Sequence, residues 1–187
     1  GGYVVTWQSA TQDNDGSGIY NIYGQRYDAQ GEAAGSEFRV NTYDASTSNQ
    51  KQPTVTGLND GGFVVVWESE EQDGDSNEKY NVYGQRFDAS GNAVGGEVLV
   101  NTDYTSDQQY NAEVTALLDG GFVVTWDSGH GGDNRDVFGQ RYDKWGAAFG
   151  DEFQINTHTH SHQQKPTVTA LTDGGFMVAW ESNGQDG

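Results

Sequence analysis

The stretch GGFVVVW, residues 61–67, decides the fold, because it recurs with small changes at regular intervals along the chain. Close variants begin at Gly1, Gly120 and Gly174, so successive copies are separated by 60, 59 and 54 residues. Repetition at this interval is typical of a tandem structural repeat. The sequence therefore predicts one repeat array over residues 1–187, with units starting at 1, 61, 120 and 174.

Within GGFVVVW, alternate residues are apolar on both faces of an extended segment. Phe63, Val65 and Trp67 share one face, while Val64 and Val66 share the other. A strand that is apolar on both faces is typically buried between two layers. We therefore expect each unit to form a sheet that packs against a neighbour on each side.

Three further blocks recur between these copies, and each has strand character. PTVTGLND begins at Pro53, YGQRFDASG at Tyr83 and EVLVNT at Glu97, and each has counterparts in the other units. The pair Asp60-Gly61 separates the first two strands, and Asp-Gly favours a tight hairpin with positive φ at both positions. Each unit is thus predicted to be four antiparallel strands without a helix.

Four antiparallel strands at this interval are typical of a propeller blade, so we predict an all-β, β-propeller-like fold. The blades would cover residues 1–45 (partial), 52–103, 110–158 and 164–187 (partial). Tandem small β-sheet modules are the alternative, although β-sandwich modules need about seven strands each. About three and a quarter blades do not close a ring of four to eight. Further copies of the repeat, from the same or another chain, are therefore expected partners.

Composition excludes several classes of function. With 28 acidic and only 9 Lys or Arg residues, the net charge is −19, which repels nucleic acid and anionic membrane surfaces. Cysteine is absent, so disulfides and thiol chemistry are excluded. No apolar run approaches the length that spans a bilayer, so membrane insertion is not expected. Because the sequence opens inside a repeat unit, we interpret it as a segment of a longer protein.

The loops between the second and third strands are acidic and hold the candidate metal ligands. Short Asp-x-Asp segments suit calcium, which takes several oxygen ligands from a turning backbone. A solvated acidic loop is the competing interpretation. The candidate calcium ligands are Asp13, Asp15, Ser17, Asp73, Asp75, Asp133 and Asp136.

Two other residue types repeat with the unit, and we interpret both as structural. Arginine recurs in the GQR segments as Arg26, Arg86 and Arg141, which favours an Arg–carboxylate pair between adjacent blades. Tryptophan ends the second strand of every unit, where it would pack between blades; the alternative is a sugar-binding surface, because a pyranose ring stacks on an indole face. These tryptophans are Trp7, Trp67, Trp126 and Trp180.

Trp145 departs from the repeat. It stands where the first two units have Gln30 and Ser90, in the loop between the third and fourth strands. We expect its side chain to be exposed, which makes it the candidate ligand-binding residue. The sequence does not identify the ligand of this residue.

No enzyme signature is visible. The chain contains no nucleophile elbow, no phosphate-binding loop and no zinc-protease helix, and its carboxylates recur with the repeat. An active site would normally break the symmetry of the repeat, so we predict a protein that is not an enzyme.

The blocks GGFVVVWES, QDGD and YNVYGQRFDASGNAVGGEVLVNT, within residues 61–102, resemble a tandem repeat of very large secreted bacterial proteins. These include calcium-binding proteins and RTX-like adhesins of type I secretion. The resemblance covers essentially the whole chain and implies an extracellular location, calcium dependence and an adhesive role at a cell surface. The GGxGxDxUx nonapeptide of that group is absent, so calcium rests on the Asp-x-Asp loops alone.

The sequence therefore favours a non-enzymatic, extracellular scaffold or adhesion module that calcium stabilises and that binds a cell-surface or glycan ligand. A carbohydrate-binding propeller lectin is the first alternative. A self-assembling filament subunit is the second, because the predicted blades do not close a ring.

Overall fold

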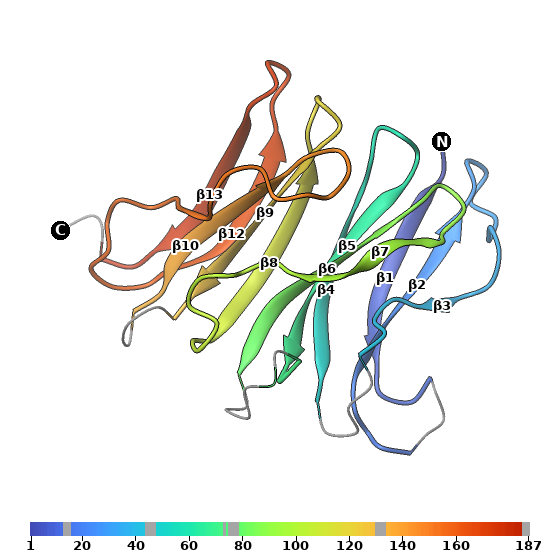
Figure 1. Cartoon of the computed structure of the whole chain (residues 1–187), viewed down its shortest axis with the longest axis horizontal. Coiled ribbons are helices and arrows are strands. Elements are labelled where there is room, and N and C mark those ends of the chain that lie inside the picture. The colour runs from blue at the N-terminus through green and yellow to red at the C-terminus, as the bar shows by residue number, and fades with distance from the viewer. Residues whose placement is uncertain (13–15, 44–47, 73, 75–78, 130–133, 185–187) are drawn as a thin grey trace.

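The computed structural model is all-β, and its strands form four antiparallel sheets that follow one another along the chain (Figure 1). The structure describes residues 1–12, 16–43, 48–72, 74, 79–129 and 134–184. These residues contain 13 strands. None of them belongs to a helix with the length and apolarity that a membrane span needs.

Each sheet corresponds to one repeat unit, with its strands side by side in chain order. We name the strands of a complete sheet a, b, c and d; the first sheet holds b, c and d, and the last holds a and b. The first sheet contains β1 (Tyr3–Ser9), β2 (Asn21–Tyr27) and β3 (Phe38–Arg39). The second contains β4 (Gln50–Gly57), β5 (Phe63–Glu70), β6 (Tyr80–Phe87) and β7 (Ala93–Leu99). The third contains β8 (Gln109–Ala116), β9 (Phe122–Ser128), β10 (Asp136–Tyr142) and β11 (Phe153–Gln154), and the last contains β12 (Gln163–Ala170) and β13 (Phe176–Ser182).

The sheets stack through their faces and meet along their a strands. Strand β4 contacts β8, β8 contacts β12, and β1 of the first sheet lies beside β4 (Figure 1). The described residues form an open row of sheets, without closure into a ring.

The prediction of two apolar faces on strand b is confirmed. Phe63, Val65 and Trp67 belong to a buried cluster shared with the first sheet. Val64 and Val66 belong to a second cluster, shared with the third sheet. The second sheet therefore contributes to two cores, which explains why its b strand is apolar throughout.

Strand d is shorter than predicted in two of three copies: β3 and β11 have two residues each, whereas β7 has seven. In those two copies the pairing of strand d with strand c is interrupted, which leaves the isolated bridges Tyr27–Ala33 and Tyr142–Ala148 ahead of β3 and β11. Beyond β3 the Asn41 Oδ1 accepts the N–H of Ile22 at 2.7 Å. The chain thus stays attached to β2 after β3 has ended.

The hairpins between strands a and b form as predicted, but their turn differs from the expected type. Leu58 N–H donates to the Gly62 carbonyl, and Gly61 N–H donates to the Leu58 carbonyl. Only Gly61 has a positive φ, of 86°, so the loop is a type I turn followed by a bulge. The Asp60 carboxylate accepts the N–H of Gly62 at 2.9 Å, which stabilises the turn without positive φ at Asp60.

A repeated hydrogen bond, which we call the latch, joins each sheet to the next. The residue after the strand-b tryptophan accepts the backbone N–H of a left-handed residue at a bulge in the following strand a. The three bulge residues have φ of 50°, 53° and 52°. The latches join Gln8 to Gln52 (2.7 Å), Glu68 to Asn111 (2.7 Å) and Asp127 to Lys165 (2.9 Å).

Candidate functional site

The hairpin between β10 and β11 has the same backbone as its counterparts but different side chains. Asp143 holds the loop, because its Oδ1 accepts the N–H groups of Trp145 and Ala147, each at 2.9 Å. Asp28 and Asp88 make the same bonds in the first two sheets. The repeat therefore fixes the loop and leaves the side chain at its tip free to vary.

Two aromatic side chains stand on the surface of this hairpin. Trp145 is 73% exposed, which confirms the expectation from the sequence, and Phe149 is 61% exposed. Lys144 lies against the indole, with its Nζ 4.5 Å from the ring centroid. Exposed large aromatic groups in one patch are characteristic of a binding surface. We call Lys144, Trp145 and Phe149 the aromatic patch.

Phe149 was missed from the sequence alone, although the signal was present. It replaces Ala34 of the first unit and Val94 of the second, just as Trp145 replaces smaller residues. A position-by-position comparison of the three hairpins would have found both aromatics, because both depart from the repeat.

A charged pair lies beside the patch. The Arg141 guanidinium bonds the Asp119 carboxylate and lies over the Phe149 ring, 4.8 Å from the centroid. The hydrogen bond from the N–H of Gly121 lowers the pKa of Asp119 below its usual range, and the Arg141 guanidinium lowers it further. The pair therefore offers both an ionised acceptor and guanidinium donors next to an aromatic face.

Trp145 also borders two shallow cavities. One, of about 220 Å³, is lined by the aromatic patch together with Asp119, Arg141, Tyr142 and Asp143. The other, of about 160 Å³, lies between the second and third sheets and includes Val94 and Val98. Aromatic faces, carboxylates and guanidinium donors around a shallow hollow can bind a ligand that has both apolar faces and hydroxyl groups.

The predicted calcium ligands are not brought together in the described part of the chain. Asp13, Asp15, Asp73, Asp75 and Asp133 lie outside the described residues. Ser17 is described, and its hydroxyl accepts the N–H of Ile19 at 3.0 Å. The described residues contain no group of three or more side chains of the metal-binding types.

Asp136, one of the predicted calcium ligands, makes a structural hydrogen bond between two strands. It is buried, and its carboxylate accepts a hydrogen bond from the Asn156 side chain at 2.6 Å. Asn156 also accepts the N–H of Val137 at 2.6 Å. Asn21 and Asn81 fill the place of Asp136 in the other units, so this residue belongs to a repeated clamp between strands c and d.

Arg86 and Arg141 pair with carboxylates, but within one sheet rather than between adjacent sheets. Arg26 instead donates to the Ser90 carbonyl of the second sheet. Arg86 on β6 bonds Asp60, which lies in the a–b hairpin of the same sheet. The a–b hairpin lies at the end of the sheet that also holds Arg86 on strand c. Asp60 of the same sheet is therefore closer to Arg86 than a carboxylate of an adjacent sheet. The aliphatic part of the Arg86 side chain contacts the third sheet, where it lies against Gly146.

The interpretation of the tryptophans as core residues is confirmed for Trp67 and Trp126, which are 0% and 1% exposed. The Trp67 Nε1–H donates to Gln50 on strand a at 2.9 Å. A buried indole whose N–H has a partner is a packing residue, so it does not offer a sugar-stacking surface.

No protein-family model matches this chain, and no curated protein matches its sequence. Solved structures are similar in fold. A Dyadobacter fermentans protein of unknown function has a TM-score of 0.61 at 13% identity, over 97% of this chain and 48% of that one. An α-L-arabinanase of Penicillium chrysogenum, solved with arabinobiose, has a TM-score of 0.57 at 19% identity, over 95% and 53% respectively.

At these identities the likeness establishes the fold alone. The chain spans about half the length of the solved structures that it matches. The row of antiparallel sheets seen here is therefore an arrangement that larger proteins also contain.

Proposed function

We propose that this chain is a propeller-like segment of an extracellular, non-enzymatic scaffold or adhesion protein, and that it binds a carbohydrate through the aromatic patch. The observation that carries the proposal is the exposure of Trp145, at 73%, beside Phe149 and the Arg141–Asp119 pair. This combination occurs in one unit, whereas the structural residues recur in several. The extracellular location rests on the sequence resemblance.

A saccharide suits this surface for chemical reasons. One face of a sugar ring carries C–H groups, which pack against an indole, and its edges carry hydroxyl groups. The Asp119 and Asp143 carboxylates can accept hydrogen bonds from hydroxyls, while Arg141 and Lys144 can donate them. The arabinanase that shares this fold was solved with a disaccharide, which supports a sugar as the first ligand class to test.

The test is a binding measurement on the whole chain. Glycan-array screening, followed by titration calorimetry with the strongest ligand and with arabinobiose, should detect a saccharide that binds with one site per chain. Trp145→Ala should weaken binding about 10- to 30-fold, as expected for a central aromatic anchor. Phe149→Ala should weaken it less, because the ring is already covered in part by Arg141.

Matched controls come from the repeat itself. Ser90→Ala changes the equivalent hairpin position in the second unit and should leave binding unchanged. Ser90→Trp places an indole there and should not restore binding to Trp145→Ala, since the second unit has Val94 where the third has Phe149. If no saccharide binds, or if Trp145→Ala binds as well as the parent chain, the carbohydrate proposal is wrong.

The absence of catalysis is tested separately. Incubation of the chain with arabinan oligosaccharides should release no shorter product, as followed by chromatography. Any product release would contradict the non-enzymatic proposal, and release that survives Trp145→Ala would point to a site outside the aromatic patch.

A further inference from the structure

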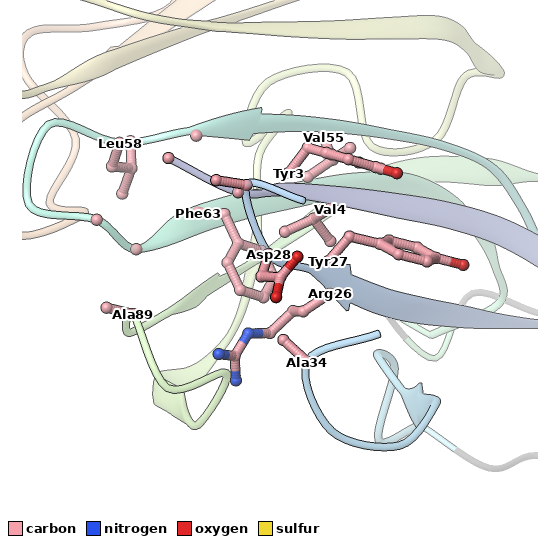
Figure 2. A pocket seen from close by; sticks show the side chains of 16 residues that line it. Tyr3, Val4, Arg26, Tyr27, Asp28, Ala34, Val55, Leu58, Phe63 and Ala89 are labelled. Atoms are coloured by element: carbon pink, nitrogen blue, oxygen red, sulfur yellow. The ribbon is translucent and has the colours of Figure 1, made fainter. Parts of the chain in front are cut away.

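One position of strand d differs between the second sheet and its two neighbours. Phe38, Val98 and Phe153 have the same register, each opposite a glycine of strand c. In the first sheet the Phe38 ring packs against Phe63 and Phe87 of the second sheet, with ring centroids 6.2 and 5.6 Å apart. Figure 2 shows Phe63 at this interface. The second sheet has valine where its neighbours present a phenyl ring to the following sheet.

The smaller side chain leaves the glycine of strand c without a ring above it. A methyl group added to Gly24 would lie 2.9 Å from the Phe38 ring, and the corresponding distance in the third sheet is 3.0 Å. At Gly84 the nearest side-chain atoms belong to valines and would be 3.6 and 3.7 Å away. The phenyl ring therefore covers this glycine in the first and third sheets but not in the second.

A cavity of about 160 Å³ lies at the place of the missing ring, between the second and third sheets. Gly84 and Val98 line it from the second sheet, and Phe122 and Tyr142 line it from the third. The last two correspond to the pair of rings that Phe38 contacts at the preceding interface. An apolar cavity of roughly 150 Å³ stays free of water and can hold benzene. The size and the lining therefore match one six-membered aromatic ring.

The cavity also has an entrance and a polar group. Val94 and Val98 line it and are 40% and 42% exposed, so a small molecule can enter from solvent. Arg86 lines it as well, and its terminal nitrogen bonds Asp60. The Nε of Arg86 is buried and has no hydrogen-bond partner among the described residues. Because a buried donor without a partner is unfavourable, an acceptor on a bound molecule would be stabilising here.

We propose that this cavity, which we call the aryl cavity, binds one aromatic ring that carries an oxygen acceptor on a short substituent. The ring takes the place of the phenylalanine of the other units, against Phe122 and Tyr142, and the oxygen accepts the Nε–H of Arg86. Tilted contacts between aromatic rings favour such a ligand over an aliphatic one of equal size.

The aryl cavity is independent of the proposed saccharide site. Trp145 and Tyr142 border the aryl cavity and also the hollow at the aromatic patch, but Val98 and Arg86 border the aryl cavity alone of these two. Substitutions at Val98 therefore test the aryl cavity without altering the side chains assigned to the saccharide.

Benzyl alcohol is the probe, titrated into the 187-residue chain and followed by methyl NMR. The methyl signals of Val98 and Val124, which line the aryl cavity, should shift with a single saturable curve. Those of Val65, which belongs to the core shared with the first sheet, should not shift. Cyclohexylmethanol has a similar size and the same hydroxyl group but no flat ring, so it should bind at least about threefold more weakly.

Two variants locate the ligand in the cavity. Val98→Phe supplies the ring that the neighbouring units have, so it should abolish the shifts and raise the melting temperature. It should leave saccharide binding unchanged. Arg86→Lys keeps the positive charge but removes the Nε–H, so it should weaken the binding of benzyl alcohol about threefold.

The reverse substitution provides the matched control. Phe38→Val gives the first sheet the residue of the second and should open an equivalent cavity above Gly24. The methyl signals of Val40 and Val65 should then respond to benzyl alcohol, in addition to those of Val98. Circular dichroism spectra and melting curves establish that each variant is folded.

Several results would overturn the proposal. These are an absence of shifts in the parent chain, unchanged shifts in folded Val98→Phe, and equal or tighter binding of cyclohexylmethanol. A folded Phe38→Val chain without the second set of shifts would overturn it too, because a missing ring would then not create a binding site. Unchanged binding to Arg86→Lys would overturn the assignment of the acceptor.

Discussion

The second and third sheets share their interior and differ on their surface. Both have four strands in the same order, a buried tryptophan on strand b and an arginine on strand c that pairs with a hairpin aspartate. At the tip of the c–d hairpin, however, the second sheet has Ser90 and the third has Trp145. Interior positions must fit a neighbouring sheet on each face, so they repeat, whereas the exposed hairpin tips are free to differ between units.

The largest expected effect separates the two kinds of tryptophan. Trp126→Ala should destabilise the chain by about 3–5 kcal/mol, because it leaves a cavity between two sheets. Trp145→Ala should change stability by less than about 0.5 kcal/mol, because the side chain is exposed. Urea unfolding followed by circular dichroism gives both values. Equal destabilisation by the two substitutions would break the division between interior and surface.

The second expected effect is a pH dependence that comes from the latch. Burial raises the pKa of Glu68 to about 7, so the folded state keeps a proton that the unfolded chain releases near its ordinary value of 4.5. The stabilisation is complete below about pH 4.5 and is lost as the pH rises to about 7, a loss of about 1–3 kcal/mol. Burial raises the pKa of Asp127, the third-unit counterpart, so it contributes in the same direction.

Glu68→Gln is the matched variant, because Gln8 already serves as the acceptor in the first latch. It should flatten the fall of melting temperature between pH 5 and pH 8, while the exposed substitution Glu32→Gln should not. A Glu68→Gln variant whose melting temperature falls as steeply as that of the parent would exclude Glu68 as the titrating group.

The clamp between strands c and d gives the third comparison. Asn156→Ala should cost about 2 kcal/mol, because the buried N–H of Val137 and the carboxylate of Asp136 both lose a partner. Asn101→Ala should cost somewhat less, since Asn81 is uncharged and takes the place of Asp136 in the second sheet. Thermal or urea unfolding of both variants measures the difference, and a larger cost in the second sheet would contradict this ranking.

Calcium offers a smaller effect that also distinguishes the units. If the acidic loops bind calcium, the ion at ten times its dissociation constant should add about 1.4 kcal/mol to stability, and a chelator should remove it. The second unit has Asp73 and Asp75, whereas the third has the isolated Asp133. Asp73→Asn should therefore reduce the shift more than Asp133→Asn. A melting temperature that is the same in calcium and in chelator would eliminate the calcium proposal.

The smallest effect concerns the exposed ion pairs. Asp60→Asn in the second sheet and Asp119→Asn in the third should each cost less than about 1 kcal/mol. Their effects on saccharide binding should differ, however, because Asp119 lines the cavity below the aromatic patch and Asp60 does not. Weakened binding in Asp60→Asn alone would place the site on the second unit.

Much of the fold could be predicted from the sequence because the strands carry local signals. The period-2 apolar pattern of residues 61–67 defined strand b and its two faces, and the Asp-Gly pairs marked the hairpins. The short d strands could not be predicted in this way, since the pairing of strands c and d is interrupted in the first and third sheets, after the bridges Tyr27–Ala33 and Tyr142–Ala148. The pattern shows which residues are strand-like but does not reveal where their pairing is interrupted.

The candidate site was predicted only in part. Trp145 stood out against the repeat, and its exposure is confirmed. Its neighbour Asp119 lies 26 residues earlier in the chain, and only the antiparallel order of the sheet brings it to Arg141. Asp136, a predicted calcium ligand, lies in the buried clamp rather than in an exposed loop, and the sequence alone does not distinguish these two settings.

The latch gives the array a direction. Each unit supplies an acceptor from its second strand, and the following unit supplies a strained left-handed residue that needs this acceptor. If the following unit unfolds, the side-chain oxygen of the acceptor residue becomes exposed to water, which can replace the lost hydrogen bond at little cost in free energy. Losing a preceding unit leaves a strained residue such as Gln52, with φ of 50°, without its support. The units of such an array should therefore unfold more easily from its C-terminal end than from its N-terminal end.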